Sequence, residues 1–180
     1  MELVRIFDLP KPTLYAIHYD NEAQDEYHRL LAIWNDPEHL YTFFSENEAD
    51  LTWYGIDPGT AALETYDLAG EMETAIQNAC QEGYEDIGLS LQMLFKPLNN
   101  NETSTDVELQ RTKAKWKWLR FYDVRIGSNC FVITGGAIKL TLEMKERPHT
   151  LNELSKIERV IDYLKDQGLY DPYDFEMLEF

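Results

Sequence analysis

The sequence lacks the patterns that mark the best-known catalytic and metal sites. Its 180 residues include two cysteines, Cys80 and Cys130, which lie far apart and form no CxxC pair and no Cys/His cluster. We interpret both as small buried apolar residues rather than as a disulfide or a metal pair. GxGxxG, GxxxxGK[ST], HExxH, GxSxG and EF-hand spacings are also missing, so we expect no metal and no cofactor.

Long apolar runs are missing as well. No apolar stretch approaches the roughly 20 residues needed to cross a bilayer, and the first residues, MELVRIFDLPKP, lack the charged and apolar regions of a signal peptide. We therefore expect a cytoplasmic protein with no membrane partner.

Basic residues are scarce and unevenly placed. The chain has 16 Lys or Arg against 33 Asp or Glu, a net charge of −17. Residues 111–147 reverse this balance, with nine basic and three acidic side chains and a local charge of +6. Because the overall charge repels nucleic acids and anionic membranes, a polyanion must be met by this basic stretch. The acidic remainder would equally suit a basic protein partner.

The distribution of apolar residues predicts an α+β protein with an antiparallel sheet and packed helices, forming one domain over residues 1–180. The sequence predicts strands at 4–7, 13–19, 115–126, 130–134 and 137–144. It predicts helices from Asn21, from Asp36-Pro37, over 60–79 and 84–94, and over 150–168. Residues 46–106 form an acidic helical insertion, which includes the low-complexity stretch NNNETSTD, interpreted as a mobile loop.

Local signals set the expected boundaries. Asn21 with Gln24, and Thr150 with Glu153, have capping-box spacing at helix starts, and Gly83 is expected to end a helix. Gly127, Ser128 and Asn129 predict a hairpin turn. Gly135-Gly136 is followed by strand-like sequence, so we interpret it as a bulge or a close backbone approach rather than a phosphate loop.

The stretch KWKWLRFYDVRI alternates cations with aromatic residues. Read as one strand, it places Trp116, Trp118 and Arg120 on one face and Lys115 and Lys117 on the other. On single-stranded RNA, the cations would hold phosphates and the aromatic rings would stack on bases. The alternative is that the aromatic face is core and the lysine face is solvated. Lys145 and Arg147 extend the basic region.

Among the four histidines, His149 is the candidate for acid–base chemistry. It follows Arg147 at the start of the last predicted helix, and a histidine with a pKa of about 6.5 supplies both protonation states near neutral pH. It could equally be a residue that merely flanks the Thr150 cap. The carboxylates follow helix surfaces and single out no acid–base pair.

The segment CFVITGGAIKLTLEMKERPHTLNELSKIERVIDYL resembles the C-terminal half of RelE/HigB-type toxins, and WKWLRFYDVRI is similar to that family's arginine-bearing strand. The resemblance implies a small α+β toxin that cleaves mRNA in the ribosomal A site without a metal and pairs with a small antitoxin protein. By position, Arg120 and Arg125 match the family's strand arginines, and Lys139 matches the first of its paired lysines. Leu140 stands where the second lysine is expected.

The resemblance thus predicts an RNA-directed, toxin-like endoribonuclease on a RelE-like core. The chain is longer than the usual toxin of this family, and the additional residues lie mainly in the acidic insertion, which could shield the basic face. The rival hypothesis is a non-catalytic module that holds a basic partner through its acidic helices or its aromatic C-terminal tail, LYDPYDFEMLEF. A third hypothesis, an enzyme that acts on a small metabolite, is supported by no motif in the sequence.

Overall fold

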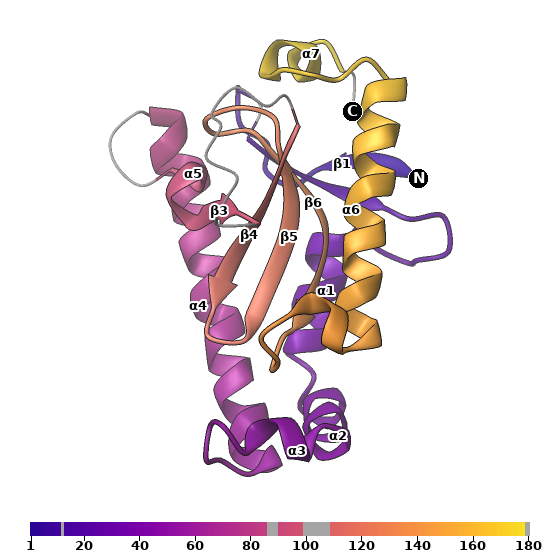
Figure 1. The fold of residues 1–180 in the computed structure, drawn as a ribbon. Coiled ribbons are helices and arrows are strands. Elements are labelled where there is room, and N and C mark those ends of the chain that lie inside the picture. The colour runs from indigo at the N-terminus through magenta and orange to yellow at the C-terminus, as the bar shows by residue number, and fades with distance from the viewer. Residues whose placement is uncertain (12, 86–89, 99–108, 179–180) are drawn as a thin grey trace.

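The computed structural model describes residues 1–11, 13–85, 90–98 and 109–178 (Figure 1). The strands are β1 (Glu2–Arg5), β2 (Leu14–His18), β3 (Phe95–Pro97), β4 (Gln110–Trp116), β5 (Leu119–Arg125) and β6 (Phe131–Ile138). The helices are α1 (Glu26–Trp34), α2 (Pro37–Glu46), α3 (Glu48–Leu51), α4 (Pro58–Glu85), α5 (Leu91–Leu94), α6 (Pro148–Asp166) and α7 (Pro172–Glu176), with a 3-10 turn, η1 (Met144–Glu146).

The strands form one six-stranded sheet in the order β1-β2-β6-β5-β4-β3. Every neighbouring pair is antiparallel except β2 and β6, which run parallel, with Leu14 opposite Phe131. This arrangement confirms the predicted α+β class, with the one parallel pair as an addition. Within the described ranges, no helix has the length and apolarity needed to span a bilayer.

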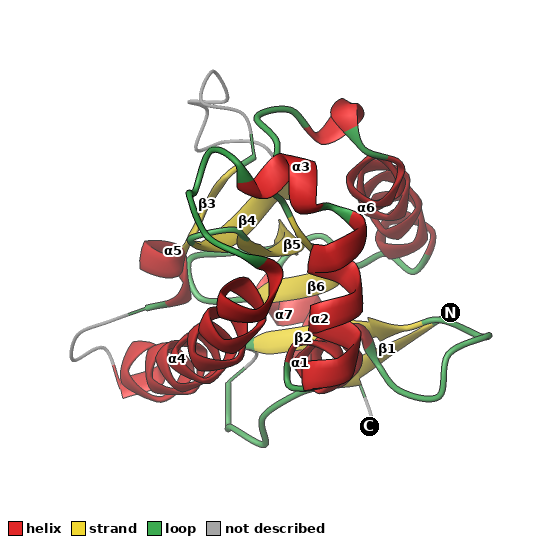
Figure 2. Cartoon of the chain, turned by 90° about the horizontal axis from the view of Figure 1, so that it is seen from below, coloured by secondary structure: helices red, strands yellow, loops and turns green. Residues whose placement is uncertain are grey.

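Helices cover the two faces of the sheet unequally. Helices α1, α2 and α4 lie against one face and α6 against the other (Figure 2). The first face builds the larger core, in which Trp34, Phe44 and Phe121 are buried. The second builds a smaller core between α6 and strands β2, β5 and β6, which includes Val160 and Phe175. Helix α6 packs mainly on β6 and β5, and it reaches β4 through the ion pair of Glu158 with Arg111.

The predicted strand over residues 115–126 is in fact two strands, and this part of the prediction is wrong. A hairpin turn at Lys117 and Trp118 separates β4 from β5, with Trp116 opposite Leu119. Lys117 adopts φ 48°, which only a few per cent of residues other than glycine do. The two turn residues shift the alternation, so Lys115 shares a face with Arg120 and Tyr122 rather than opposing them.

The glycine pair lies inside β6, which is a continuous strand, directly after a bulge at Thr134. The pairing of β5 with β6 shifts register between Tyr122, opposite Gly135, and Asp123, opposite Ile133. This confirms the predicted bulge. The predicted extended structure over 137–144 is wrong beyond Ile138, because a turn and η1 follow. The hairpin turn at residues 127–129 is confirmed, since it joins β5 to β6.

Three predicted helix boundaries are wrong. Helix α1 is capped by Asp25, whose side chain accepts the Tyr27 and His28 backbone N–H groups, rather than by Asn21. Helix α4 continues through Gly83 to Glu85. Helix α6 begins at Pro148, and the Thr150 hydroxyl donates to backbone carbonyls of the preceding turn instead of capping the helix. The Asp36-Pro37 start of α2 is confirmed by hydrogen bonds from the backbone to Asp36.

The aromatic tail packs away from the basic residues. Helix α7 buries Phe175, whose ring lies 5.0 Å from that of Tyr15, and Pro172 lies close to Gly127 in the β5–β6 turn. In Figure 1, α7 covers the end of the sheet opposite the β4–β5 hairpin. The predicted mobile loop at 99–106 lies outside the described residues.

Candidate functional site: a basic cleft on the sheet

The part of the sheet left open beside α6 forms a cleft of about 1050 Å³. Its walls come from β4, β5, the segment after β6, Leu98 after β3, Leu154 of α6, and Tyr54 in the connection before α4. Seven basic side chains line it: Arg111, Lys113, Lys115, Lys117, Arg120, Lys139 and Lys145. Among the described residues, Glu143 is the one carboxylate in the lining. In a protein of net charge −17, this is a concentrated positive surface.

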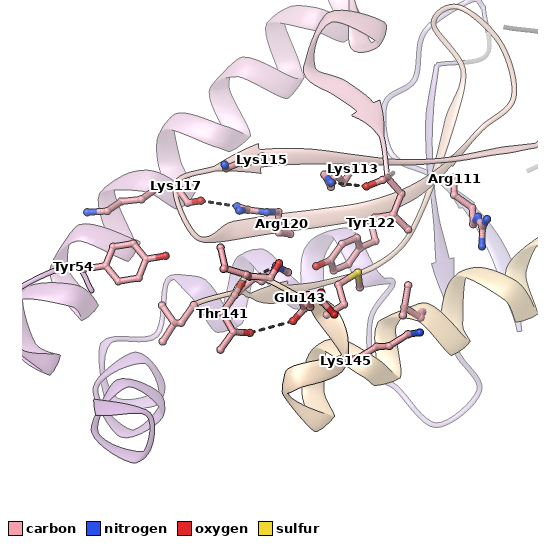
Figure 3. A pocket seen from close by; sticks show the side chains of 16 residues that line it. Tyr54, Arg111, Lys113, Lys115, Lys117, Arg120, Tyr122, Thr141, Glu143 and Lys145 are labelled. Carbon is pink, nitrogen blue, oxygen red and sulfur yellow. Dashed lines mark hydrogen bonds between the residues drawn. The ribbon is translucent and has the colours of Figure 1, made fainter. Parts of the chain in front are cut away.

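The β4–β5 hairpin explains how the cations come together. Successive side chains of a strand point to opposite faces, so β4 directs Arg111, Lys113 and Lys115 into the cleft while Thr112 and Ala114 are buried. The same alternation directs Arg120 and Tyr122 of β5 into the cleft (Figure 3).

The inner cations Lys113, Arg120 and Lys139 are held by backbone carbonyl groups. Lys113 Nζ donates to the carbonyl of Leu98 at 2.7 Å. Arg120 Nη1 donates to Lys117 O at 2.6 Å and to Leu119 O at 2.7 Å, and Lys139 Nζ donates to Thr141 O at 2.7 Å and to Leu142 O. None of the three has an ion-pair partner in the described chain. Their positions are therefore fixed while their charges remain uncompensated.

The inner cations are also crowded. Burial lowers the pKa of Lys113, and the charges of Arg120 and Lys115 lower it further. Burial likewise lowers the pKa of Lys139, with added repulsion chiefly from Arg120 and Lys113. An anion bound between these groups would relieve that repulsion, so the cleft is prepared for negative charge.

The outer cations differ in their pairing. Lys117 Nζ lies 2.5 Å from Glu64 of α4, and Arg111 Nη1 lies 2.7 Å from Glu158 of α6. Lys115 and Lys145 are exposed and have no ion pair with any described residue. Glu64 of the acidic insertion thus reaches the cleft only at its rim and leaves the interior uncovered.

Tyr122 adds a neutral polar group to the cleft. Its side chain is 1% exposed, and its hydroxyl has no hydrogen-bond partner among the described residues. Burial raises its pKa above the ordinary value, so the hydroxyl keeps its proton at neutral pH. A buried hydroxyl without a partner is destabilising.

Five of the residues predicted from the sequence meet in this cleft: Arg120, Lys139, Lys115, Lys117 and Lys145. Two further candidates, Arg125 and His149, do not line it. Arg125 Nε donates to Gly127 O at 3.0 Å, at the far end of β5. His149 Nε2 lies 3.0 Å from the carbonyl of Ile138, and its ring packs edge-on against Phe43.

The two tryptophans and Arg147 also lie outside the cleft lining. Trp118 is 0% exposed, and its indole N–H donates to the Thr65 hydroxyl at 2.8 Å. Trp116 is half-buried against the larger core. These contacts agree with the alternative that the tryptophans belong to the core, and they remove Trp118 as an exposed stacking surface. Arg147 pairs with Asp50 of α3, with Nε 2.8 Å from Oδ2.

Sequence reasoning missed Lys113, Tyr122, Tyr54 and Leu142 as cleft residues. The spacing of Arg111, Lys113 and Lys115 at every second position carried a usable signal for Lys113. Tyr54 and Leu142 gave no such signal, because they come from connections whose course depends on the packed helices.

Part of the buried charge lies outside the cleft, where α1 meets α6. Lys156 Nζ lies 3.0 Å from Glu26 and 3.1 Å from Glu153, and Arg29 Nε lies 2.6 Å from Glu26. The described residues contain no group of His, Cys, Asp and Glu suited to holding a metal ion. Both cysteines are buried and unpaired, as predicted.

Comparisons of the chain with protein-family models, with curated proteins and with solved structures found no match. The resemblance to RelE/HigB-type toxins therefore stays a prediction.

Proposed function

We propose that the protein binds single-stranded RNA in the basic cleft and cleaves it without a metal ion, as the RelE/HigB resemblance implies. The observation that carries the proposal is the convergence of seven Lys and Arg side chains in one cavity of a strongly acidic protein. The remaining negative surface opposes non-specific binding of polyanions, which directs an RNA chain to this one surface.

The inner cations are suited to the transition state of phosphodiester cleavage. Negative charge grows on the phosphate oxygens as the bond breaks, and fixed cations in a partly desolvated site stabilise it. Arg120 is 8% exposed and held by two backbone carbonyls, so it needs little rearrangement to meet that charge. Lys113 and Lys139 face the same cavity.

Lysines of lowered pKa can also move protons. Of Lys113 and Lys139, one in its minor neutral form would take the proton of a ribose 2′-hydroxyl, whose oxygen then forms a bond to phosphorus, while the other stays an ammonium group beside the phosphate. The bond from phosphorus to the 5′ oxygen breaks, and an ammonium group returns a proton to that oxygen. The products are a 2′,3′-cyclic phosphate and a 5′-hydroxyl, and no metal or oxidant is consumed. Arg125 and His149 have no place in this scheme, because they do not line the cleft.

An in vitro translation assay tests the cleavage. Added wild-type protein should arrest translation and leave cut mRNA. In control reactions with ribosome-free RNA, cleavage should persist when EDTA is present. The new 5′ ends should accept a kinase label without prior phosphatase treatment. The double variant Arg120→Ala/Lys139→Ala should relieve the arrest. A folded wild-type protein that cuts no RNA, with or without ribosomes, would overturn the nuclease proposal.

RNA binding is tested separately by its salt dependence. With five unpaired cations in contact with phosphates, the slope of log K against log salt should be about −3 to −4 for single strands. Lys113→Ala should reduce that slope by about 0.7. Lys165→Ala removes the same charge from an exposed position of α6 outside the cleft lining, so it should leave the slope unchanged.

A second candidate, the non-catalytic module, is favoured by the charge of the helical layer. Residues 30–95 contain thirteen Asp or Glu and no Lys or Arg. Such a surface would hold a basic protein segment by electrostatic attraction. Retention of one defined basic protein by the Arg120→Ala/Lys139→Ala variant, without any RNA binding by the wild type, would favour this candidate.

A further inference from the structure

Two apolar side chains that are exposed to solvent border the cations of the cleft. Leu142 is 94% exposed and Tyr54 is 36% exposed, yet both line the cavity that holds Lys113, Arg120 and Lys139. Single exposed apolar residues are ordinary on a protein surface. Two of them in the wall of one strongly basic cleft place apolar surface beside the cations where phosphates would bind.

Tyr54 is held in place by the core beneath it. Its backbone N–H donates to Leu51 O at 2.8 Å, and its ring meets that of Trp118 edge-on, with centroids 5.1 Å apart and planes at 88°. Trp118 is itself fixed by its hydrogen bond to Thr65. Figure 3 shows Tyr54 at the end of the cleft near Lys117, with Arg111 at the opposite end.

Leu142 is held by a cation of the cleft. Lys139 Nζ donates to the carbonyl of Leu142 and, at 2.7 Å, to that of Thr141. The turn that presents the leucine side chain to solvent is therefore tied to one of the inner cations. A phosphate bound to Lys139 and a base in contact with Leu142 would lie close together, as the phosphate and the base of one nucleotide do.

We propose that Tyr54 and Leu142 form a binding site for an unpaired nucleobase, while the adjoining phosphates lie on Lys139, Arg120 and Lys113. The inference rests on the proposed RNA binding and narrows its substrate to strands whose bases are free to leave a stack. Aromatic side chains beside a cationic groove bind single strands in this way, with little preference for sequence. This site takes the stacking role that the sequence suggested for Trp118, which the fold buries.

The cleft suits single strands better than a duplex. Its volume of about 1050 Å³ lies near the upper end of the usual range for small-ligand pockets, so it has room for a few nucleotides. Bases inside a duplex are paired and stacked and cannot reach a side chain in the wall without being pulled out, which adds an energetic cost.

The test compares ligands that have the same backbone charge with and without bases. Fluorescence anisotropy would measure the affinity of the full-length protein for a 2′-O-methyl oligonucleotide, which cannot be cleaved, and for the same oligonucleotide with abasic positions. Unlabelled inorganic polyphosphate and a duplex serve as competitors. The wild type should bind the strand with bases about tenfold more tightly than the abasic strand, because each stacked base contributes roughly that factor.

Tyr54→Ala and Leu142→Ala should each reduce this preference and leave the affinity for the abasic strand and for polyphosphate unchanged. Tyr66→Ala and Leu63→Ala are the matched controls, because these side chains are 49% and 72% exposed on α4 and do not line the cleft. Leu142 is nearly fully exposed, so its substitution tests the site even if Tyr54→Ala disturbs the packing of Trp118.

The outcomes separate the two proposals. Equal affinity for strands with and without bases, or equal competition by duplex, overturns the base site and leaves phosphate binding in the cleft intact. Failure of every polyanion to bind overturns the proposed function together with the base site. Loss of the preference in Tyr66→Ala or Leu63→Ala, with retention in Leu142→Ala, would place the base elsewhere and overturn the inference.

Discussion

The carboxylate of Glu153 fills the space directly above Gly135, so that a β-carbon on Gly135 would overlap Oε2 of Glu153. This contact explains the first glycine of the pair in β6. The second, Gly136, is constrained by the opposite strand, because its β-carbon would lie 2.5 Å from the carbonyl of Arg120. The two glycines thus allow α6 and β5 to approach the same short stretch of β6.

Gly135→Ala should destabilise the protein because the new methyl group overlaps a buried carboxylate. Overpacking of this kind reduces the free energy of unfolding by about 1–3 kcal/mol. Urea unfolding followed by circular dichroism would measure the change. Glu153→Ala removes the overlapping group, so the double variant should lose less stability than the sum of the two single variants.

Gly70→Ala is the control for this substitution. Gly70 lies within α4, and no atom outside its own helix turn lies within 4 Å of an added β-carbon. Alanine is favoured over glycine in a helix interior by about 0.5–1 kcal/mol, so this variant should gain stability. Equal effects at both glycines would contradict the overlap at Gly135.

The stability of the protein should fall as Glu153 ionises. Burial raises the pKa of Glu153 from 4.5 to about 7, although Lys156 and Arg29 lower it in part and Glu26 raises it further. The folded state therefore binds more protons than the unfolded state between these two pH values. The free energy of unfolding then decreases as pH rises through this window, by up to about 3 kcal/mol from this group.

Glu153→Gln should remove this part of the pH dependence. Urea unfolding would give the free energy of unfolding of the wild type and the variant at pH 5 and at pH 8. The free energy of the variant minus that of the wild type should be larger at pH 8 than at pH 5. A difference between the proteins that stays constant with pH would show that Glu153 is ionised throughout.

Tyr122→Phe should separate stability from ligand binding. The hydroxyl of Tyr122 is buried without a described partner, so its removal should leave the free energy of unfolding unchanged or raise it by up to about 1 kcal/mol. Because the hydroxyl is buried, the same change should leave RNA binding unchanged. A loss of stability would mean that the hydroxyl bonds within the fold.

Thr65→Val should destabilise the protein without affecting RNA. It removes the acceptor of the Trp118 indole N–H and leaves a buried donor unsatisfied, which costs about 1–3 kcal/mol. Thr74→Val on the exposed side of α4 should change stability by no more than about 0.5 kcal/mol. RNA affinity that fell with Thr65→Val in a fully folded sample would return Trp118 to the binding site.

The sequence predicted well those features that depend on neighbouring residues. Asp36 supplies the N-cap and Pro37 has a φ angle that suits the first position of a helix, and α2 begins there. The basic residues from 111 to 147 were predicted to form one positive region because a count of charges needs no tertiary information, and seven of the nine line one cleft. The glycine pair was recognised as a bulge because glycine has no side chain to conflict with the opposite strand.

The sequence failed where tertiary packing selected between local alternatives. Lys117 and Trp118 carry no turn signal, and the buried hydrogen bond from Trp118 to Thr65 of α4 fixes the hairpin there. A single strand over 115–126 was longer than strands usually are, which was the available warning. Without this turn, the predicted single strand placed Lys115 and Lys117 on the face opposite Arg120. In the structure all three side chains line the same cleft.

The parallel pairing of β2 with β6 has a consequence for the order in which the chain can fold. Leu14 pairs with Phe131, so the partner of β2 leaves the ribosome only after most of the chain has been synthesised. During that time the buried stretch LYAI of β2 has β1 as its sole neighbouring strand in the sheet order. Pairings so distant in sequence slow folding and expose strand edges that aggregate. We therefore expect the first twenty residues to be prone to aggregation until β6 has been synthesised.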